Sequence, residues 1–346
     1  MSTTNMAIDQ NNPARCGLAW ATKVVASGAF ITKRDPKEVL TLSCSWMAAP
    51  DHVMKEALEQ KNPRALMELP VEINVDEDDE LVQLSLNGET AFARKYGDQG
   101  CIILDQPDDA LSFEPTPVKR APITDDFEPA EAPNADGAGS TGLNAGAVNE
   151  AVELAFANPM QFTNALLVVH KGKVIVERYR EPYDRQTQFE SWSMGKSVAA
   201  SLTGVAEKAG AIDLDESDLF EEWRADANDD RRSIRVRDIL NMASGLEFTG
   251  SFGKDEDHSI KSENGRFLDH IYVYGGGVNS VAFCLGKPLA DPPGTAGRYR
   301  NCDPLLATAL VRERMVDGNI QEFLNWPQAN LYDPIGSAGM ILETDP

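Results

Sequence analysis

Cysteine and histidine are scarce in this chain, and their scarcity argues against a metal centre. The five cysteines form no Cys-x-x-Cys pair and are odd in number, and the four histidines show no ligand spacing. A zinc site, a disulfide framework and any cofactor are therefore not expected. The residues concerned are Cys16, Cys44, Cys101, Cys284, Cys302, His52, His170, His258 and His270.

Long apolar runs are also lacking. Residues 1–15 are polar, with no basic segment leading into an apolar stretch, and residues 16–31 are interrupted by Lys23, Ser27 and Gly28. Neither a signal peptide nor a membrane-spanning helix is predicted. The cytoplasm is the default location, and the periplasm is the alternative if the true start lies further upstream.

Basic residues are few relative to acidic ones. The chain has 32 Lys and Arg against 55 Asp and Glu, a net charge of −23 and a pI near 4.5. Such a surface repels nucleic acid and anionic membranes, so those partners are disfavoured. An apolar fraction of 42% over 346 residues is enough for a core in two structural units. The oligomeric state is left open.

Residues 1–104 are predicted to form an accessory α+β unit. The segments 37–42 and 53–58 have helical character, and an Asn87-Gly88 turn joins two of four short β-rich segments. The predicted strands are 71–75, 81–86, 91–95 and 101–104. No group of candidate catalytic or ligand-binding residues is recognised in this unit.

Residues 105–146 change in composition. The segment is acidic and rich in Ala and Gly, and it holds six prolines between Pro107 and Pro133. This pattern predicts a linker, or an extended segment lying along a neighbouring part of the protein. Order is predicted to return at residue 147.

The segment 147–346 contains helical and hairpin patterns. Two β-rich runs, 165–170 and 174–179, flank Lys171-Gly-Lys173 and predict an antiparallel hairpin. The apolar and small residues of 194–209 predict a largely buried helix. Further helices are expected at 147–156, 233–242 and 304–315, with a turn at 243–246.

Ser193-Met-Gly-Lys196 opens the predicted helix 194–209 and is the most informative pattern in the chain. A serine at the first helical turn lies at the positive end of the helix. Backbone N–H groups there can stabilise the negative charge that develops during its attack on a substrate. Lys196 lies one turn further on the same face, where apolar neighbours would desolvate it and lower its pKa. The pair then has the chemistry of a nucleophile and its proton acceptor. The alternative is a helix-capping serine beside a lysine that reaches into water.

Tyr299 and Asn301 follow the Asp291-Pro-Pro-Gly294 turn, which is expected to present them rigidly. Tyr299 can carry the proton onward to the leaving group, and Asn301 can hold Lys196 through a hydrogen bond. The alternative for Tyr299 is an ordinary core tyrosine. Cys302 is interpreted as a small buried residue rather than a nucleophile. A second Ser-x-x-Lys match, Ser251-Phe-Gly-Lys254, lies in a glycine- and aspartate-rich loop and is set aside.

With these motifs, residues 147–346 resemble the serine beta-lactamase-related hydrolases of the class C type. The group includes class C beta-lactamases, D-alanyl-D-alanine peptidases, class VIII esterases and 6-aminohexanoate-dimer hydrolases. The resemblance implies a five-stranded antiparallel sheet flanked by helices, with a helical lobe beside it and the site between them. The matching pieces are the hairpin 166–179, Ser193-Met-Gly-Lys196, Ile234-Arg-Val-Arg-Asp-Ile-Leu240 with Ser244-Gly-Leu246, Pro292-Pro-Gly294 with Tyr299-Arg-Asn301, and Leu331-Tyr-Asp-Pro-Ile-Gly336.

The chain departs from the family pattern after Asn301. The family's third box, Lys-Thr-Gly or a relative on a later strand, supplies an oxyanion N–H, and none follows Asn301. His170-Lys-Gly172 lies upstream in the hairpin turn and is rejected as this box. The expectation is therefore an incomplete chain whose C-terminal strands are missing and whose oxyanion hole lacks one half.

Two functions are weighed. The favoured one is a serine hydrolase that cleaves a small amide or ester through an acyl-enzyme on Ser193, with Lys196 and Tyr299 transferring protons. The alternative is a non-catalytic binding protein that recognises a peptide or cell-wall fragment on the same scaffold, with the N-terminal unit as interaction module. The shortened chain could also be inert as expressed.

Overall fold

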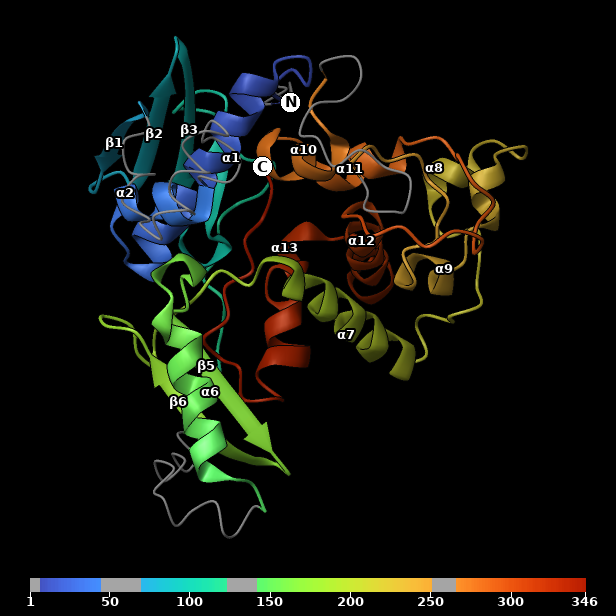
Figure 1. Ribbon diagram of the computed structural model, residues 1–346. Helices are drawn as coiled ribbons and strands as arrows, with labels where there is room; N and C mark the ends of the chain where they lie inside the picture. The colour runs from blue at the N-terminus through green and yellow to red at the C-terminus, as the bar shows by residue number, and fades with distance from the viewer. Residues whose placement is uncertain (1–6, 45–69, 123–141, 251–265) are drawn as a thin grey trace.

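The structure is a computed structural model, and it describes residues 7–44, 70–122, 142–250 and 266–346. Figure 1 shows an N-terminal helix-and-sheet unit, a hairpin with one helix beside it, and a lobe of helices. The α+β class expected from the sequence is confirmed. The predicted helix 53–58 and the Ser251-Phe-Gly-Lys254 match lie outside the described residues.

The N-terminal sheet is an antiparallel meander in the order β1-β2-β3-β4. Its strands are β1 (Glu72–Asp76), β2 (Leu81–Leu86), β3 (Glu89–Lys95) and β4 (Cys101–Leu104). All four predicted strands are thus confirmed to within two residues at either end. Asn87 and Gly88 connect β2 to β3 with φ of 53° and 86°. Positive φ at both turn residues suits the right-handed twist of a two-residue hairpin.

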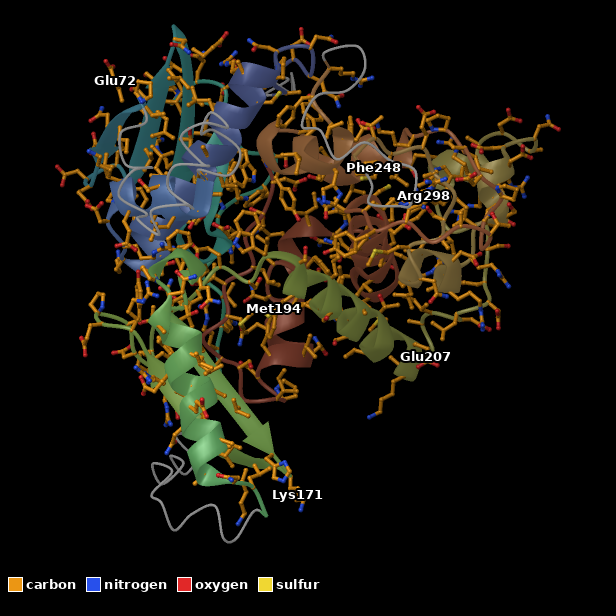
Figure 2. All side chains as sticks on the ribbon, viewed as in Figure 1. Glu72, Lys171, Met194, Glu207, Phe248 and Arg298 are labelled. Carbon is orange, nitrogen blue, oxygen red and sulfur yellow. The ribbon has the colours of Figure 1, made fainter. Side chains whose placement is uncertain are left out.

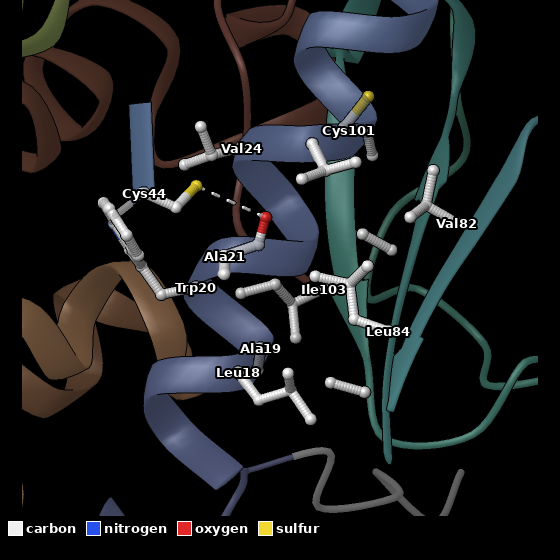
Figure 3. Packing of buried hydrophobic residues seen from close by; sticks show 14 of the residues in the cluster. Leu18, Ala19, Trp20, Ala21, Val24, Cys44, Val82, Leu84, Cys101 and Ile103 are labelled. Carbon is white, nitrogen blue, oxygen red and sulfur yellow. Dashed lines mark hydrogen bonds between the residues drawn. The ribbon is translucent and has the colours of Figure 1, made fainter. Parts of the chain in front are cut away.

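Helix α1 (Pro13–Ser27) covers one face of this sheet. The Asn12 side chain caps its first turn by accepting a hydrogen bond from the Arg15 N–H. Leu18 and Val25 on α1 share a buried cluster with Val82 and Leu84 on β2. Figure 3 shows this packing, with Trp20 on the side of α1 that is turned away from Val82 and Leu84.

A second helical segment follows α1. The π-helical turn η1 (Gly28–Thr32) continues α1, and α2 (Pro36–Val39) leads into the π-helical turn η2 (Leu40–Cys44). The helical character predicted for 37–42 is therefore confirmed. Asp35 caps α2 by accepting from the Glu38 N–H, and Val39 is buried against the α1 cluster.

The described part of the acidic segment, residues 105–122, is extended and lies along its neighbours. The Thr116 N–H donates at 2.8 Å to Oε1 of Gln99, the last residue of the short 3-10 turn η4 (Gly97–Gln99). The Lys119 N–H donates to Asn325 Oδ1 at 2.9 Å in the helical lobe. This segment therefore bridges the N-terminal unit and the lobe.

The hairpin predicted from the sequence is confirmed, and a helix lies beside it. Helix α6 (Ala145–Ala157) precedes the 3-10 turn η5 (Pro159–Gln161), and β5 (Ala165–His170) pairs with β6 (Lys173–Tyr179). Figure 1 shows these elements projecting from the rest of the molecule. Among the described residues after 142, these are the two strands that form, rather than the five that the resemblance implies, because the chain after Asn301 continues as helices and irregular segments.

The lobe is built around α12 (Cys302–Val316), which packs against α7 (Gly195–Lys208), α9 (Val236–Leu240) and α11 (Ser280–Leu285). Its core includes Trp223 and Leu306, both fully buried. The remaining elements are η6 (Trp192–Met194), α8 (Glu221–Arg224), η7 (Asp230–Ser233), α10 (Asp269–Gly275), α13 (Ile320–Phe323) and η8 (Gln328–Tyr332). In the described parts of the chain, no helix combines the length and apolar character needed to cross a membrane.

Two helix predictions need correction. The helix 194–209 is not largely buried: Ala199, Leu202, Thr203 and Ala206 are inside, while its other face is exposed to solvent. Its small residues look buried in the sequence because alanine and glycine carry little polarity, but α12 covers one side only. The helix predicted for 233–242 is shorter, since α9 begins at Val236 and Met242 takes a positive φ of 51°.

Helix α10 joins the N-terminal unit to the lobe. Its Tyr272 belongs to the cluster around α1, and its Val273 belongs to the lobe core. The Tyr272 hydroxyl donates to the Ile8 carbonyl at 2.6 Å, and the Ile8 N–H donates to the Gly276 carbonyl at 2.8 Å. A Cβ at Gly275 would lie 2.6 Å from the Cys16 carbonyl oxygen, so glycine permits this close approach of α10 to α1.

Candidate active site

Ser193 lies in the 3-10 turn η6, directly before α7 begins at Gly195. The turn is closed by the Met194 N–H, which donates to the Ser191 carbonyl at 3.0 Å. Trp192, the residue before the serine, has a positive φ of 45°. Ser193 itself is exposed, so its hydroxyl is open to a ligand.

Lys196 lies one turn after Ser193 on the same side of the helix start. Its Nζ donates to Ser193 Oγ at 3.2 Å and to Asn301 Oδ1 at 2.7 Å. Lys196 is half-buried, while Gly195 and Ser197 on either side of it are exposed. The flanking residues therefore do not enclose the lysine as the sequence predicted, because this face of α7 is open.

Asn301 is the residue immediately before α12, and it is buried with 4% of its surface exposed. Its Oδ1 accepts from Lys196, and its Nδ2 donates to the His270 carbonyl at 2.6 Å. These two partners fix which end of the amide faces the lysine. The packing of α12 on α7 thus brings together residues that are 105 positions apart.

Tyr299 contacts Lys196 through the face of its ring. Lys196 Nζ lies 4.7 Å from the ring centroid, a cation–π distance. The tyrosine is 38% exposed, so it is not an ordinary core residue. The centroid of its ring also lies 6.2 Å from that of the His270 ring, at an interplanar angle of 42°.

A buried ion pair holds the turn that carries Tyr299 and Asn301. Arg300, between them, is 1% exposed, and Asp303 is fully buried. Arg300 Nε lies 3.2 Å from Asp303 Oδ2. Arg300 Nη2 and the Asp303 carboxylate both bond the Ser244 hydroxyl, at 3.1 Å and 2.6 Å. Burial raises the pKa of Asp303, and the Arg300 charge opposes that rise.

Gly245 and Gly294 allow the 243–246 and 291–294 turns to pack closely against each other. Gly245 has φ of 79°, and a Cβ there would lie 2.0 Å from the Asp291 carbonyl oxygen. Gly294 has φ of 76°, and its N–H donates to the Ala243 carbonyl at 2.8 Å. The 291–294 turn is thereby fixed against the 243–246 turn.

Sequence reasoning missed His270 and Ser244 as neighbours of the site. His270, on α10, is 7% exposed, and its pKa falls from 6.5 to about 4 because it is buried and then because Lys196 is nearby. A lone histidine in a sequence carries no signal for such a place. Ser244 lay within a motif that pointed to the family, but no role could be read from it.

Other residues considered from the sequence lie elsewhere. Cys302 is fully buried at the start of α12, as predicted, and burial raises the pKa of its thiol well above the usual value. His170 belongs to the hairpin. Figure 2 shows its neighbour Lys171 at the hairpin tip, well away from Met194 at the site.

Comparison with protein families matches residues 155–340 to the family described as Beta-lactamase. This match spans more than half of the chain, so the chain belongs to the beta-lactamase family, a family of serine hydrolases.

Among solved structures, the chain is similar to a putative 6-aminohexanoate-dimer hydrolase from Bacillus anthracis, with 17% sequence identity and a TM-score of 0.39. The similarity covers 54% of this chain and 47% of that protein, so the chain spans about half of its length. No curated protein matches.

Proposed function

We propose that this chain is a serine hydrolase that cleaves a small amide or ester through an acyl-enzyme on Ser193. The position of Lys196 Nζ carries the proposal, since it lies 3.2 Å from Ser193 Oγ and 2.7 Å from Asn301 Oδ1. A serine hydroxyl attacks readily only if a base takes its proton. The hydrogen bond to Asn301 fixes the Lys196 amine beside the serine hydroxyl, within reach of the proton that it would accept.

The reaction balances with groups on this chain. Ser193 Oγ forms a bond to the substrate carbonyl carbon while its proton passes to Lys196 Nζ. The tetrahedral intermediate collapses, the bond to the leaving nitrogen or oxygen breaks, and Tyr299 gives that atom a proton. The Lys196 ammonium, whose Nζ lies 4.7 Å from the centroid of the Tyr299 ring, then returns a proton to the tyrosine. Water repeats the sequence on the acyl-enzyme and releases the acid.

The surroundings of Ser193 support an uncharged substrate with an apolar part. Met194 and Tyr299 are large apolar side chains that remain 67% and 38% exposed near the serine. Such exposed apolar groups often mark places where ligands bind. The net charge of −23 disfavours strongly anionic substrates.

We also propose the domain organisation predicted from the sequence. The four candidate residues, Ser193, Lys196, Tyr299 and Asn301, all belong to 147–346, which supports that segment as the hydrolase domain. Residues 1–104 form the accessory unit, and 105–146 connect the two.

Short-chain p-nitrophenyl esters and p-nitroanilides test the proposal on the full chain. A stoichiometric burst of p-nitrophenol before the steady state is expected from the activated esters, because their acylation is faster than the release of the acyl-enzyme by water. Ser193→Ala removes the burst, whereas Ser197→Ala, at an exposed serine on the same helix, keeps it. A burst that survives Ser193→Ala, or no turnover of any ester or anilide by the wild type, contradicts the proposal.

A further inference from the structure

Trp192, next to the candidate nucleophile, has a backbone conformation that a bulky residue rarely adopts. Its φ of 45° lies in the left-handed region, which costs a non-glycine residue free energy. Trp192 is also 46% exposed, so burial of its own side chain does not account for the conformation. Such a residue persists only where its surroundings hold it.

The contact that holds Trp192 comes from the N-terminal unit. The ring of Trp20, on α1, lies 5.7 Å from the ring of Trp192 at an angle of 43°. Trp20 is 2% exposed and lies on the side of α1 away from Val82 and Leu84 (Figure 3). It is fixed in place by α10, because a Cβ at Gly275 would come within 2.9 Å of the Trp20 Cβ.

A second contact holds the chain just upstream. Arg34, whose side chain is 3% exposed, donates to Glu190 Oε1 at 3.3 Å and to Glu38 Oε1 at 3.3 Å. Glu38 also accepts from the Tyr183 hydroxyl at 3.0 Å. The N-terminal unit thus contacts both Glu190 and Trp192, and Ser193 is the next residue along the chain.

We propose that Trp20 is a positioning residue for Ser193. Its ring packs against the Trp192 ring and holds Trp192 in the left-handed conformation, which places Ser193 Oγ beside Lys196 Nζ. This inference rests on the proposed function, and it gives the N-terminal unit a role in the site. Figure 2 agrees with it, since Met194 lies at the end of α7 nearer the N-terminal unit and Glu207 at the far end. Neither tryptophan needs to touch the reacting atoms.

The inference predicts a defect in the rate of acylation rather than in binding. Inactivation by a fluorophosphonate probe on the full chain separates the two, since saturation kinetics give a maximal rate constant and an apparent binding constant. In Trp192→Ala the maximal rate constant is expected to fall about 10- to 100-fold, as for a misplaced reacting group. The binding constant stays within about threefold, and Trp192→Phe, which keeps a ring, restores most of the rate.

A double-mutant cycle shows whether Trp20 acts through Trp192. Trp20→Leu is expected to lower the maximal rate constant in the same way, and the Trp20→Leu/Trp192→Ala double variant to be no slower than the slower single variant. Leu167→Ala, at an exposed residue on the hairpin, is the control and keeps the wild-type rate. If Trp20→Leu does not fold, the Trp192→Ala and Trp192→Phe pair decides alone, because Trp192 is half-exposed.

The outcomes separate this inference from the proposed function. A wild-type chain whose Ser193 does not react overturns the proposed function. A reactive wild type whose Trp192→Ala variant reacts at the same maximal rate overturns the positioning role only. A change confined to the binding constant, equal loss in Trp192→Phe and Trp192→Ala, or additive losses in the double variant also overturn it.

Discussion

Asn301 Oδ1 lies 2.7 Å from Lys196 Nζ, although the two residues are 105 positions apart in the chain. The contact exists because α12 packs on α7 with the start of each helix near the other. It holds the lysine nitrogen 3.2 Å from Ser193 Oγ. A serine and a lysine one helical turn apart thereby gain a fixed geometry, which is what proton transfer between them requires.

Removal of the lysine is expected to abolish rapid acylation without unfolding the chain. In Lys196→Ala the rate of reaction with a fluorophosphonate probe should fall about 10²- to 10⁴-fold, the usual contribution of a general base. Lys208→Ala is the matched control, because Lys208 is an exposed lysine in the last turn of the same helix. Equal reactivity of the two variants would exclude Lys196 as the base.

Replacement of Asn301 by leucine should affect both stability and reactivity. The side chain is 4% exposed and makes hydrogen bonds with Lys196 and the His270 carbonyl. Loss of these bonds leaves buried polar groups unsatisfied, so the free energy of unfolding should drop by about 1–3 kcal/mol. Urea unfolding measures the drop, and probe kinetics measure the loss of acylation.

The control for this change is Asn330→Leu. Asn330 is exposed on η8 and donates to the Trp326 carbonyl. Its replacement should shift the free energy of unfolding by no more than about 0.5 kcal/mol and leave acylation unchanged. If Asn301→Leu behaves like Asn330→Leu, the anchoring role of Asn301 is wrong.

The two arginines beside Tyr299 should differ sharply in their effect on stability. Arg300→Met leaves the buried Asp303 carboxylate without its ion-pair partner, which should cost about 3–5 kcal/mol. Arg298→Met removes a partly exposed pair with Asp291, which should cost about 0–1 kcal/mol. Urea unfolding of both variants tests this difference, and similar costs would contradict the assignment of Arg300 as the support of the turn.

His270 should make the fold sensitive to mild acid. Its pKa falls from 6.5 to about 4 on folding, chiefly through burial and then through the charge of Lys196. Between these values the unfolded chain binds a proton that the folded chain does not. The stability that neutral His270 contributes is therefore complete above about pH 6.5 and is lost as the pH falls towards 4, by about 3 kcal/mol in total.

The variant His270→Gln isolates this contribution from that of the carboxylates. The free energy of unfolding of the wild type, measured relative to His270→Gln, should decline from pH 7 to pH 4 by about that amount. Acidic residues shared by both proteins cancel in the difference. Parallel pH profiles for the two proteins would contradict the buried, neutral state of His270.

Local patterns were enough to predict much of the fold. The alternation of Val82 and Leu84 with polar residues, and the Asn87-Gly88 turn, predicted β2 and its hairpin because strand faces and turn chemistry are local properties. The Ser193 and Lys196 spacing predicted a shared helix side for the same reason. The serine, lysine and asparagine then come together as predicted.

These local patterns could not predict tertiary contacts. The Trp20 and Trp192 contact, the bonds of Arg300 and Asp303 to Ser244, and the place of His270 depend on which distant segments pack together. The open face of α7 was missed for a related reason. Ala200 and Gly204 fit a buried or an exposed position equally well, so their burial depends on a neighbour that the sequence pattern does not specify.

The central claim is that Lys196 makes Ser193 reactive, and mapping of a covalent adduct tests it most directly. The full chain, Ser193→Ala and Lys196→Ala are each treated briefly with a fluorophosphonate or a penicillin, digested, and analysed by peptide mass spectrometry. The account predicts one stoichiometric adduct on Ser193 in the wild type, none in Ser193→Ala, and only a trace in Lys196→Ala. An adduct on a different residue, or an undiminished Ser193 adduct in Lys196→Ala, would contradict it.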